Sequence, residues 1–596
     1  MESRIKDVWD NPVGHDILAK ILLQVGVSPK IITTPIVSSI RLKRLVKPAA
    51  KILDEGFWDA FLKLVNSEQD RPQKGDGPIT KAWWKEAVFY QIYPRSFCAD
   101  GLKGITQKLD RLQDLGINAL WLSPIYDSPM DDNGYDIRDY QKIAPMFGTM
   151  ADFDMLLKEV HDRGMKLIMD LVVNHTSDEH AWFQSAVNDP DSPYRNWYFF
   201  RQDEGHVPNN WTSFFSGKAW DQYGNNGDWA LHLFSRKQPD LNWDEPAVRQ
   251  AVADMVNSWL DKGVDGFRLD VINYISKDEG LPDGDASVGT LMGFTGIEHY
   301  YYGPHLHEYL HELHEAAFAP HHAFSVGETP GLGMEMAKLV TGEERQELDM
   351  IFSFDHLETP GHTRFEEYRY DLNYYRDYII DWTQHYGNNC WMSLFYNNHD
   401  NPRMVSKVDP TGEHRRAVAK LLAVMQFTLK GTPFVYQGDE MGLANIDFAS
   451  MDEIQDVESK GMYKQLLDEG KTEAEAFRIV KAGTRDHARA LLPWDGPNEY
   501  GQTVDDEIED VYRRLIALRH QEPTLVYGDM TVLDRRKDRF VYERKSSDAV
   551  FVIDCDLGDK PTKAWHADNT WMLVYPDKLE DAKLPPYGAR IWKKIQ

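Results

Sequence analysis

The chain has 596 residues, of which 42% are hydrophobic and 27% are charged, and its net charge at neutral pH is −29. These proportions are typical of a folded chain with a large core and exclude a disordered one. A surface this acidic repels the phosphate backbone of nucleic acids. We therefore expect no nucleic-acid partner. Three widely spaced cysteines exclude a disulfide framework and favour a cytoplasmic location. We see neither a signal peptide nor an apolar run long enough for a transmembrane segment.

Residues 1–80 differ from the rest and are predicted to form a helical N-terminal extension. Residues 16–26 have an Asp cap and a Gly stop, and residues 55–65 have helical apolar spacing. Between them, residues 30–51 contain six basic and no acidic residues. This basic segment could dock on the acidic body of the protein, on a partner or on a membrane surface. We favour the body.

From about residue 87, short apolar runs alternate with helix-length segments. Alternation of strand and helix repeated eight times predicts an α/β fold built on a (β/α)8 TIM barrel. The expected strands are residues 88–93, 119–123, 166–173, 266–269, 323–326, 350–354, 392–396 and 433–436.

The segments that interrupt this alternation predict the remaining domains. After the third strand, residues 177–240 are rich in Asn, Gly, Trp and Phe and predict an inserted subdomain B. This insertion divides the catalytic barrel into residues 81–176 and 241–522. A charged helical insertion at 446–484 is expected to form a lid or buttress near the barrel mouth. Residues 523–596 have strand patterns separated by turns, which predict a C-terminal antiparallel β domain.

Three acidic residues follow predicted strands, where barrels carry their catalytic groups. Asp270 follows the fourth strand, Glu328 the fifth and Asp400 the seventh, so we expect them at one mouth. Arg268 shares a strand face with Asp270 and would keep this carboxylate ionised. Two carboxylates that flank a scissile bond are the device of glycosidases: one attacks the anomeric carbon and the other protonates the leaving oxygen.

A metal centre is the alternative interpretation of these acids together with His175 and His399. No cysteine contributes, the two histidines lack zinc-binding spacing, and an arginine lies within the cluster. We therefore favour glycosidase chemistry.

Seven motifs resemble, in the expected order, those of the α-amylase superfamily of glycoside hydrolases, family 13. Within it the chain is most similar to the oligo-1,6-glucosidase and dextran glucosidase group, from about Trp84 to the C-terminus. The motifs are QIYPRSF (91–97), DDNGYDI (131–137), DLVVNH (170–175), QPDLNW (238–243), GFRLDV (266–271), VGE (326–328) and NNHD (397–400). The resemblance implies a retaining exo-α-glucosidase that acts on a small oligosaccharide from its non-reducing end.

The resemblance also implies a role for each matching residue. Asp270 would be the nucleophile, Glu328 the general acid and base, and Asp400 the third acid, which grips sugar hydroxyls. Asp132 and Arg489 would clamp the non-reducing sugar. The implied substrate-binding residues are Asp132, Tyr135 as stacking platform, His175 and His399 as hydroxyl ligands, Phe234 and Gln238 as pocket walls, Arg268, Val271 and Arg489.

The residue after the nucleophile bears on linkage. In this group a Val at that position accompanies α-1,6 bonds, so Val271 implies isomaltose and short isomalto-oligosaccharides as substrates. A single methyl discriminates by only about 1–3 kcal/mol. An α-1,4-preferring α-glucosidase and a sucrose-active transglucosidase or isomerase, forming isomaltulose or trehalulose, therefore stay open. The segment 355–361 lacks the Arg/Asp-rich run of the isomerases.

Two further comparisons with the family concern metals and inactive members. Residues 97–104 lack most of the oxygen ligands that bind calcium or magnesium in many relatives. We expect no metal and no other cofactor. Some barrels of this family serve as inactive scaffolds or transporter partners, but those have lost the acids that this chain keeps.

Overall fold

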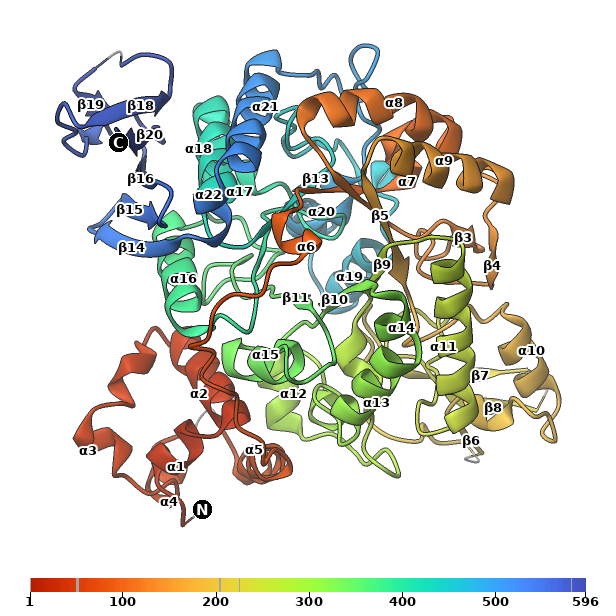
Figure 1. The fold of residues 1–596 in the computed structure, drawn as a ribbon. Coiled ribbons are helices and arrows are strands. Elements are labelled where there is room, and N and C mark those ends of the chain that lie inside the picture. Colours follow the sequence, from red (N-terminus) through yellow and green to blue (C-terminus); the bar gives the residue numbers. More distant parts are fainter. Residues whose placement is uncertain (1, 50–52, 203–204, 225, 580, 596) are drawn as a thin grey trace.

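The computed structural model describes residues 2–49, 53–202, 205–224, 226–579 and 581–595, and its centre is a barrel of parallel strands (Figure 1). A parallel bridge between Ile351 and Met392 joins the two end strands and closes the barrel. The predicted (β/α)8 TIM barrel is therefore confirmed. Its strands in the described chain are β1 (Phe89–Ile92), β2 (Ala119–Leu122), β5 (Lys166–Leu171), β9 (Gly266–Leu269), β10 (Phe324–Glu328), β11 (Met350–Phe352), β12 (Ser393–Leu394) and β13 (Thr432–Tyr436).

Helices surround this barrel and bury its strands on both faces, which is why the strands are mostly apolar. Strand β9 begins at Gly266, where a Cβ atom would lie only 2.1 Å from the carbonyl oxygen of Phe324 on β10. Close pairing of these two strands therefore requires glycine. The longest helices around the barrel are α8 (Gly101–Leu115), α9 (Met150–Asp162), α11 (Pro246–Asp261), α16 (Leu372–His385), α18 (Arg415–Thr428) and α21 (Asp506–Gln521).

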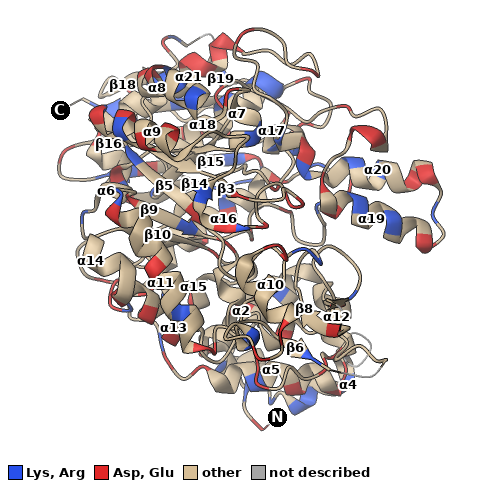
Figure 2. Ribbon diagram, turned by 90° about the vertical axis from the view of Figure 1, so that its right-hand side faces the viewer, with Lys and Arg blue, Asp and Glu red and all other residues tan. Residues whose placement is uncertain are grey.

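Two insertions rise from the barrel near its mouth. The first follows β5 and carries α10 (Ala181–Asn188) with the antiparallel strands β6 (Phe200–Arg201), β7 (Trp220–Tyr223) and β8 (Asp228–Leu231). The second is a pair of helices, α19 (Val457–Asp468) and α20 (Glu473–Gly483), which projects from the body and carries charges of both signs (Figure 2). Its Gly461 lies against the first insertion, since a Cβ there would be 2.7 Å from the carbonyl oxygen of Phe215.

The chain ends in an antiparallel sheet, as expected. Its strand order is β14-β15-β16-β20-β18, beside a small pair formed by β17 and β19. The bounds are β14 (Asp529–Asp534), β15 (Arg539–Lys545), β16 (Val550–Asp556), β17 (Thr562–Lys563), β18 (Trp571–Tyr575), β19 (Lys583–Leu584) and β20 (Ala589–Lys594).

The N-terminal extension is helical and lies against the barrel beside α12 (Ala286–Met292) and α15 (Met334–Thr341) (Figure 1). Asp16 accepts hydrogen bonds from the backbone amides of Glu335 (3.2 Å) and Met336 (2.8 Å), so it caps α15. The described helices of the extension are α1 (Ile5–Trp9), α2 (Pro12–Gln24), α3 (Pro35–Ser38), α4 (Lys43–Ala49) and α5 (Glu55–Ser67).

The basic segment makes its described ion pairs within the extension itself. Arg41 and Lys43 bind Glu2 at 2.8 and 2.6 Å. Lys51 lies outside the described residues. Which surface this segment meets therefore stays a prediction. In the part of the chain described, no helix combines the length and apolar character needed to cross a membrane.

Candidate active site

A pocket of about 380 Å³ opens at the barrel mouth and is lined by most of the expected site residues. The three acids reach it from the ends of β9 and β10 and from the loop after β12. The expected residues that line it are Asp132, Tyr135, His175, Phe234, Asp270, Val271, Glu328, His399 and Asp400.

Arg268 connects the acids beneath this pocket. Its buried guanidinium donates from Nη1 to Asp170 Oδ1 (2.6 Å) and to Asp270 Oδ1 (2.7 Å). From Nη2 it donates to Glu328. Strand register explains this arrangement, because Arg268 is paired with Asp170 on β5 and lies two residues before Asp270 on β9. The carboxyl groups of Asp270 and Glu328 are therefore held close together by one cation.

Burial raises the pKa of both carboxyl groups, although Arg268 opposes the shift. The pKa of Glu328 rises to about 8 and that of Asp270 to about 7, and Glu328 hydrogen bonds to Asp270. Since an ionised Asp270 raises the pKa of Glu328, the pair loses its two protons one after the other. An ionised nucleophile beside a protonated acid is the charge state that glycoside cleavage requires.

Val271 adopts a backbone conformation that is rare for a β-branched residue, with φ 36° and ψ 40°. This left-handed turn aims its backbone amide at Glu328 Oε2, at 3.3 Å. Strain of this kind persists only where the surroundings impose it, and it is concentrated at functional sites. The turn also places the Val271 side chain in the pocket wall.

Asp132 is paired with Arg485. Arg485 Nη2 lies 3.0 Å from Asp132 Oδ1, and its Nη1 lies 3.1 Å from Asp400 Oδ1. Arg489 donates to Asp400 Oδ1 (2.8 Å) and to the carbonyl oxygen of His399 (2.7 Å). Arg489 is thus held beside Asp400, and its expected role at the non-reducing sugar stays a prediction.

Arg485 and Arg489 influence the charge of the nearby acids Asp132 and Asp400. Burial alone would raise the pKa of Asp400, but His399, Arg485 and Arg489 lower it well below its usual range. Burial outweighs the arginines at Asp132, whose pKa rises to about 6.

Gln238 was expected in the pocket wall, but it lies behind the wall. Its side chain is buried and donates to Asp132 Oδ2 (3.1 Å) and to the carbonyl oxygen of Tyr135 (3.2 Å). Gln238 thus positions Asp132. Phe234 does line the pocket and stacks on Phe214, with ring centroids 5.1 Å apart.

Tyr135 lines the pocket as an aromatic surface that its neighbours fix in place. Its ring is parallel to the imidazole of His399, at 5.1 Å and 4°. Its hydroxyl donates to Asp170 Oδ2 at 3.1 Å. Burial lowers the pKa of His399 to about 3, so this imidazole is neutral at neutral pH. Its two ring nitrogens lie within hydrogen-bond distance of Gln91 (2.9 Å) and Asp400 (3.1 Å), which fix its orientation.

Several pocket residues carried no sequence signal that we recognised. Glu458, from α19, lines the pocket and forms an ion pair with Arg364 at 2.5 Å. Asp456, just before that helix, lies 2.6 Å from Arg485. The second insertion therefore contributes to the pocket itself. Arg485 belongs to the same RDHAR segment as Arg489, which was the signal that could have found it.

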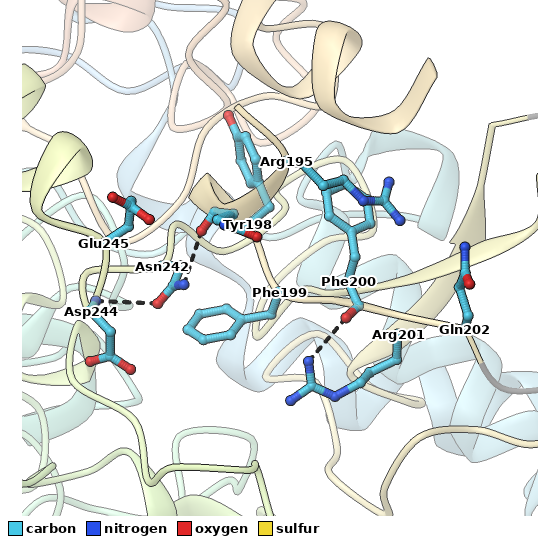
Figure 3. Close-up of a pocket in the computed structure, with 10 residues that line it drawn as sticks. Arg195, Tyr198, Phe199, Phe200, Arg201, Gln202, Asn242, Asp244 and Glu245 are labelled. Atoms are coloured by element: carbon cyan, nitrogen blue, oxygen red, sulfur yellow. Dashed lines mark hydrogen bonds between the residues drawn. The ribbon is translucent and has the colours of Figure 1, made fainter. Parts of the chain in front are cut away.

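Subdomain B has a separate pocket of about 390 Å³ (Figure 3). Some of its polar groups are bonded to each other: Asn242 donates to the carbonyl oxygen of Asn196 (2.9 Å) and accepts from the amide of Asp244 (3.2 Å). Arg201 donates to the carbonyl oxygen of Phe200 at 3.0 Å. This pocket shares no lining residue with the one that holds the three acids.

Known proteins resemble this chain over most of its length. The family model "Alpha amylase, catalytic domain" matches residues 91–528. An oligo-1,6-glucosidase from Bacillus cereus is 44% identical over 558 residues, which cover 86% of this chain and 100% of that protein. A trehalose-6-phosphate hydrolase from Bacillus subtilis is 43% identical over 71% of this chain and 76% of its own. The crystal structure of the trehalulose synthase MutB from Pseudomonas mesoacidophila superposes with a TM-score of 0.80 at 35% identity, covering 86% of this chain and 100% of that one.

Proposed function

Since the chain belongs to the α-amylase family of glycoside hydrolases, we propose that it is a retaining exo-α-glucosidase that hydrolyses α-1,6 bonds in isomaltose and short isomalto-oligosaccharides. The observation that carries this proposal is the joint contact of Arg268 with Asp270 and Glu328. It keeps a nucleophile and an acid side by side in one pocket, as double displacement requires.

In the first step, Asp270 forms a bond to the anomeric carbon of glucose while the glycosidic bond breaks. Glu328 transfers its proton to the leaving oxygen, so the remaining sugar departs as a neutral alcohol. The product is a β-glucosyl ester of Asp270. In the second step Glu328, now ionised, takes a proton from water, and the water oxygen replaces Asp270 at the same carbon. Two inversions release α-glucose, and both residues recover their starting charge.

The other polar groups fit recognition of a terminal glucose. Asp132, Asp400 and Arg485 form one buried ionic network at the end of the pocket. Such a network can bind several hydroxyls of a non-reducing sugar, which supports exo action. Tyr135 offers its ring face to the sugar.

The α-1,6 preference is supported by Val271 in the wall and by relatives named oligo-1,6-glucosidase at 39–44% identity. A sucrose-active isomerase is the second candidate, because solved structures of trehalulose and isomaltulose synthases superpose at a TM-score of 0.80. A cytoplasmic location is supported by the three cysteines, Cys98, Cys390 and Cys555, which are free thiols.

Parallel time courses with isomaltose, maltose and sucrose would test this function. We expect glucose from isomaltose faster than from maltose, little conversion of sucrose, and no product from the Asp270→Asn variant. Isomaltulose or trehalulose as the main product from sucrose would establish the isomerase instead. Faster cleavage of maltose would reverse the assigned linkage preference.

A further inference from the structure

The N-terminal extension contacts two loops that form part of the wall of the active-site pocket. The loop after β10 contributes Pro330 and Gly331 to the lining, and the loop after β11 contributes Phe354. Lys20 on α2 meets both loops: its ammonium group donates to the carbonyl oxygen of Gly331 and lies 3.1 Å from Asp355 Oδ1. One side chain of the extension thus connects two segments of the pocket wall.

The ion pair between Lys20 and Asp355 is partly shielded from water. The side chain of Lys20 is 29% exposed and that of Asp355 is 27% exposed. Burial raises the pKa of Asp355, and Lys20 opposes this rise, as a direct contact should. Solvent screens a partly buried pair less than a pair on the open surface. This pair can therefore hold the two loops at a fixed separation.

The turn at Gly331 has a backbone conformation that its neighbours impose. Gly331 has a φ of 92°, and a Cβ atom there would lie 2.7 Å from the ring of Tyr301. Its carbonyl oxygen also accepts a hydrogen bond from the Tyr301 hydroxyl (2.8 Å), and Asn273 donates to the carbonyl oxygen of Pro330 (3.2 Å). The barrel holds the inner side of this turn, and Lys20 adds the connection to the loop after β11.

A second residue of α2 contacts the same segment. Asp16 precedes Lys20 by four residues, so the two side chains lie on one face of the helix. Asp16 caps α15, and a Cβ atom at Gly333 would lie 2.5 Å from Asp16 Cγ. This face of α2 therefore contacts the segment from Gly331 to Met336 at both of its ends.

The position of this wall points to the leaving group. Gly331 follows Glu328 by three residues, and Glu328 protonates the leaving oxygen in the proposed function. Asp132 and Arg485 bind the terminal sugar there. The segment directly after Glu328 is thus placed beside the departing sugar. The family model begins at residue 91, so it includes neither Lys20 nor any other part of the extension.

We propose that Lys20 is a positioning residue for cleavage: by joining the loops after β10 and β11, it holds the wall against which the leaving sugar lies. The extension then completes the active site. This inference rests on the proposed function. It adds no chemical step, because Lys20 acts only through the Gly331 carbonyl group and the Asp355 carboxylate.

Isomaltose and α-glucosyl fluoride are the two probes. They share the glucose and the attack by Asp270, but fluoride is a single atom and does not extend along the wall. For Lys20→Met we expect kcat/KM for isomaltose to fall about tenfold or more, because small displacements of a positioned group are costly. The value for α-glucosyl fluoride should stay within about twofold. A general loss of structure would lower both values.

Three further variants locate the effect. Lys20→Arg keeps a cationic donor and should recover most of the lost activity. Lys63→Met is the matched control: Lys63 pairs with Asp278, so this change also removes an ion pair between the extension and the barrel, but neither residue lines the pocket. It should leave both substrates within about twofold. Lys20→Met/Asp355→Asn leaves no unpaired carboxylate and should show the selective loss even if Lys20→Met does not fold. Thermal unfolding verifies the fold of each variant.

The outcomes separate this inference from the function on which it rests. If the wild type does not cleave isomaltose, the proposed function fails. If the wild type does cleave it, and removal of Lys20 lowers neither substrate or lowers both equally, the positioning role alone is wrong. It is also wrong if Lys63→Met shows the same selective loss, because the effect would then belong to docking of the extension in general.

Discussion

The two sides of the pocket are built from different parts of the chain and with different chemistry. The side that would hold the terminal glucose is ionic: Arg485 lies within 3.1 Å of both Asp132 and Asp400. The rest of the lining is largely apolar and includes Val271, Met292, Phe294, Ile297 and Phe354. Ionic networks demand accurate geometry, whereas apolar walls accept many shapes. The comparison indicates a strict requirement for glucose beside a tolerant site for the leaving group.

The largest expected effect is at the nucleophile. Asp270→Asn keeps the shape of the side chain but cannot form the glucosyl ester, so kcat for isomaltose should fall by about 10⁴-fold or more. The matched control is Asp265→Asn, before the same strand, where the carboxylate binds Lys166 and the amide of Leu167. The control should lose stability and keep most of its turnover. Equal losses of turnover in the two variants would contradict this role for Asp270.

Substitution of Arg485, which pairs with Asp132 and Asp400, gives the next largest effect. Arg485→Lys removes a fork that contacts Asp132 and Asp400 together, and we expect kcat/KM for isomaltose to fall about 100-fold or more, with a raised KM. Arg489→Lys should cost less, since Arg489 reaches Asp400 and the His399 carbonyl but not Asp132. Steady-state kinetics on both variants checks the order. The reverse order would restore Arg489 as the clamp.

The pH profile reports the acids that the two sides share. As pH rises through the pKa of Asp270, about 7, the nucleophile ionises and kcat/KM rises; above the pKa of Glu328, about 8, the acid loses its proton and kcat/KM falls. We expect a bell that changes about tenfold per pH unit on each limb. Because the two carboxyl groups titrate together, each limb reports the Asp270–Glu328 pair and not one residue alone. The alkaline limb should disappear in Glu328→Gln, and an unchanged limb there would assign it to another group.

The smallest expected effect concerns how the extension is held. His307 lies between Glu347 (2.7 Å) and Glu68 of the extension (3.3 Å). Burial would lower its pKa, but the two carboxylates raise it from 6.5 to about 9. Its stabilising contribution is thus complete below pH 6.5 and is lost as pH rises through 9. The Tm difference between the wild type and His307→Gln should shrink between pH 6 and pH 10, and a constant difference would contradict the bridge.

The sequence predicted the barrel and the acids well because both depend on local patterns. The eight strands are short and mostly apolar, and each of the three acids lies at the end of a strand or in the loop after it. Arg485 and Arg489 could not be told apart, because they lie four residues apart around one tight helical turn and only packing decides which reaches Asp132. Gln238 was expected in the pocket wall for a similar reason. Its motif indicates a position near the sugar, but it does not show that Asp132 lies between Gln238 and the pocket.

The cavity of about 490 Å³ between the N-terminal extension and the barrel could not be predicted at all. It exists only because α2 docks on α15 and α5 on α12, and nothing local in residues 16–26 or 55–65 indicates which surface these helices meet. An aliphatic helix face looks the same in sequence whether it covers a core or lines a cavity. Contacts between an added segment and an existing fold are therefore the part that needed the structure.

The most direct test of the account is to trap the covalent intermediate. An α-glucosyl fluoride with a second fluorine on the ring forms the glucosyl ester quickly and releases it slowly, so mass spectrometry of peptides can locate the sugar. We predict that the peptide with Asp270 gains one fluoroglucosyl group, and that this group is lost after addition of isomaltose. A label on another carboxylate, or rapid turnover of this reagent with no label and with the β-anomer of the fluoroglucose as product, would contradict the central claim.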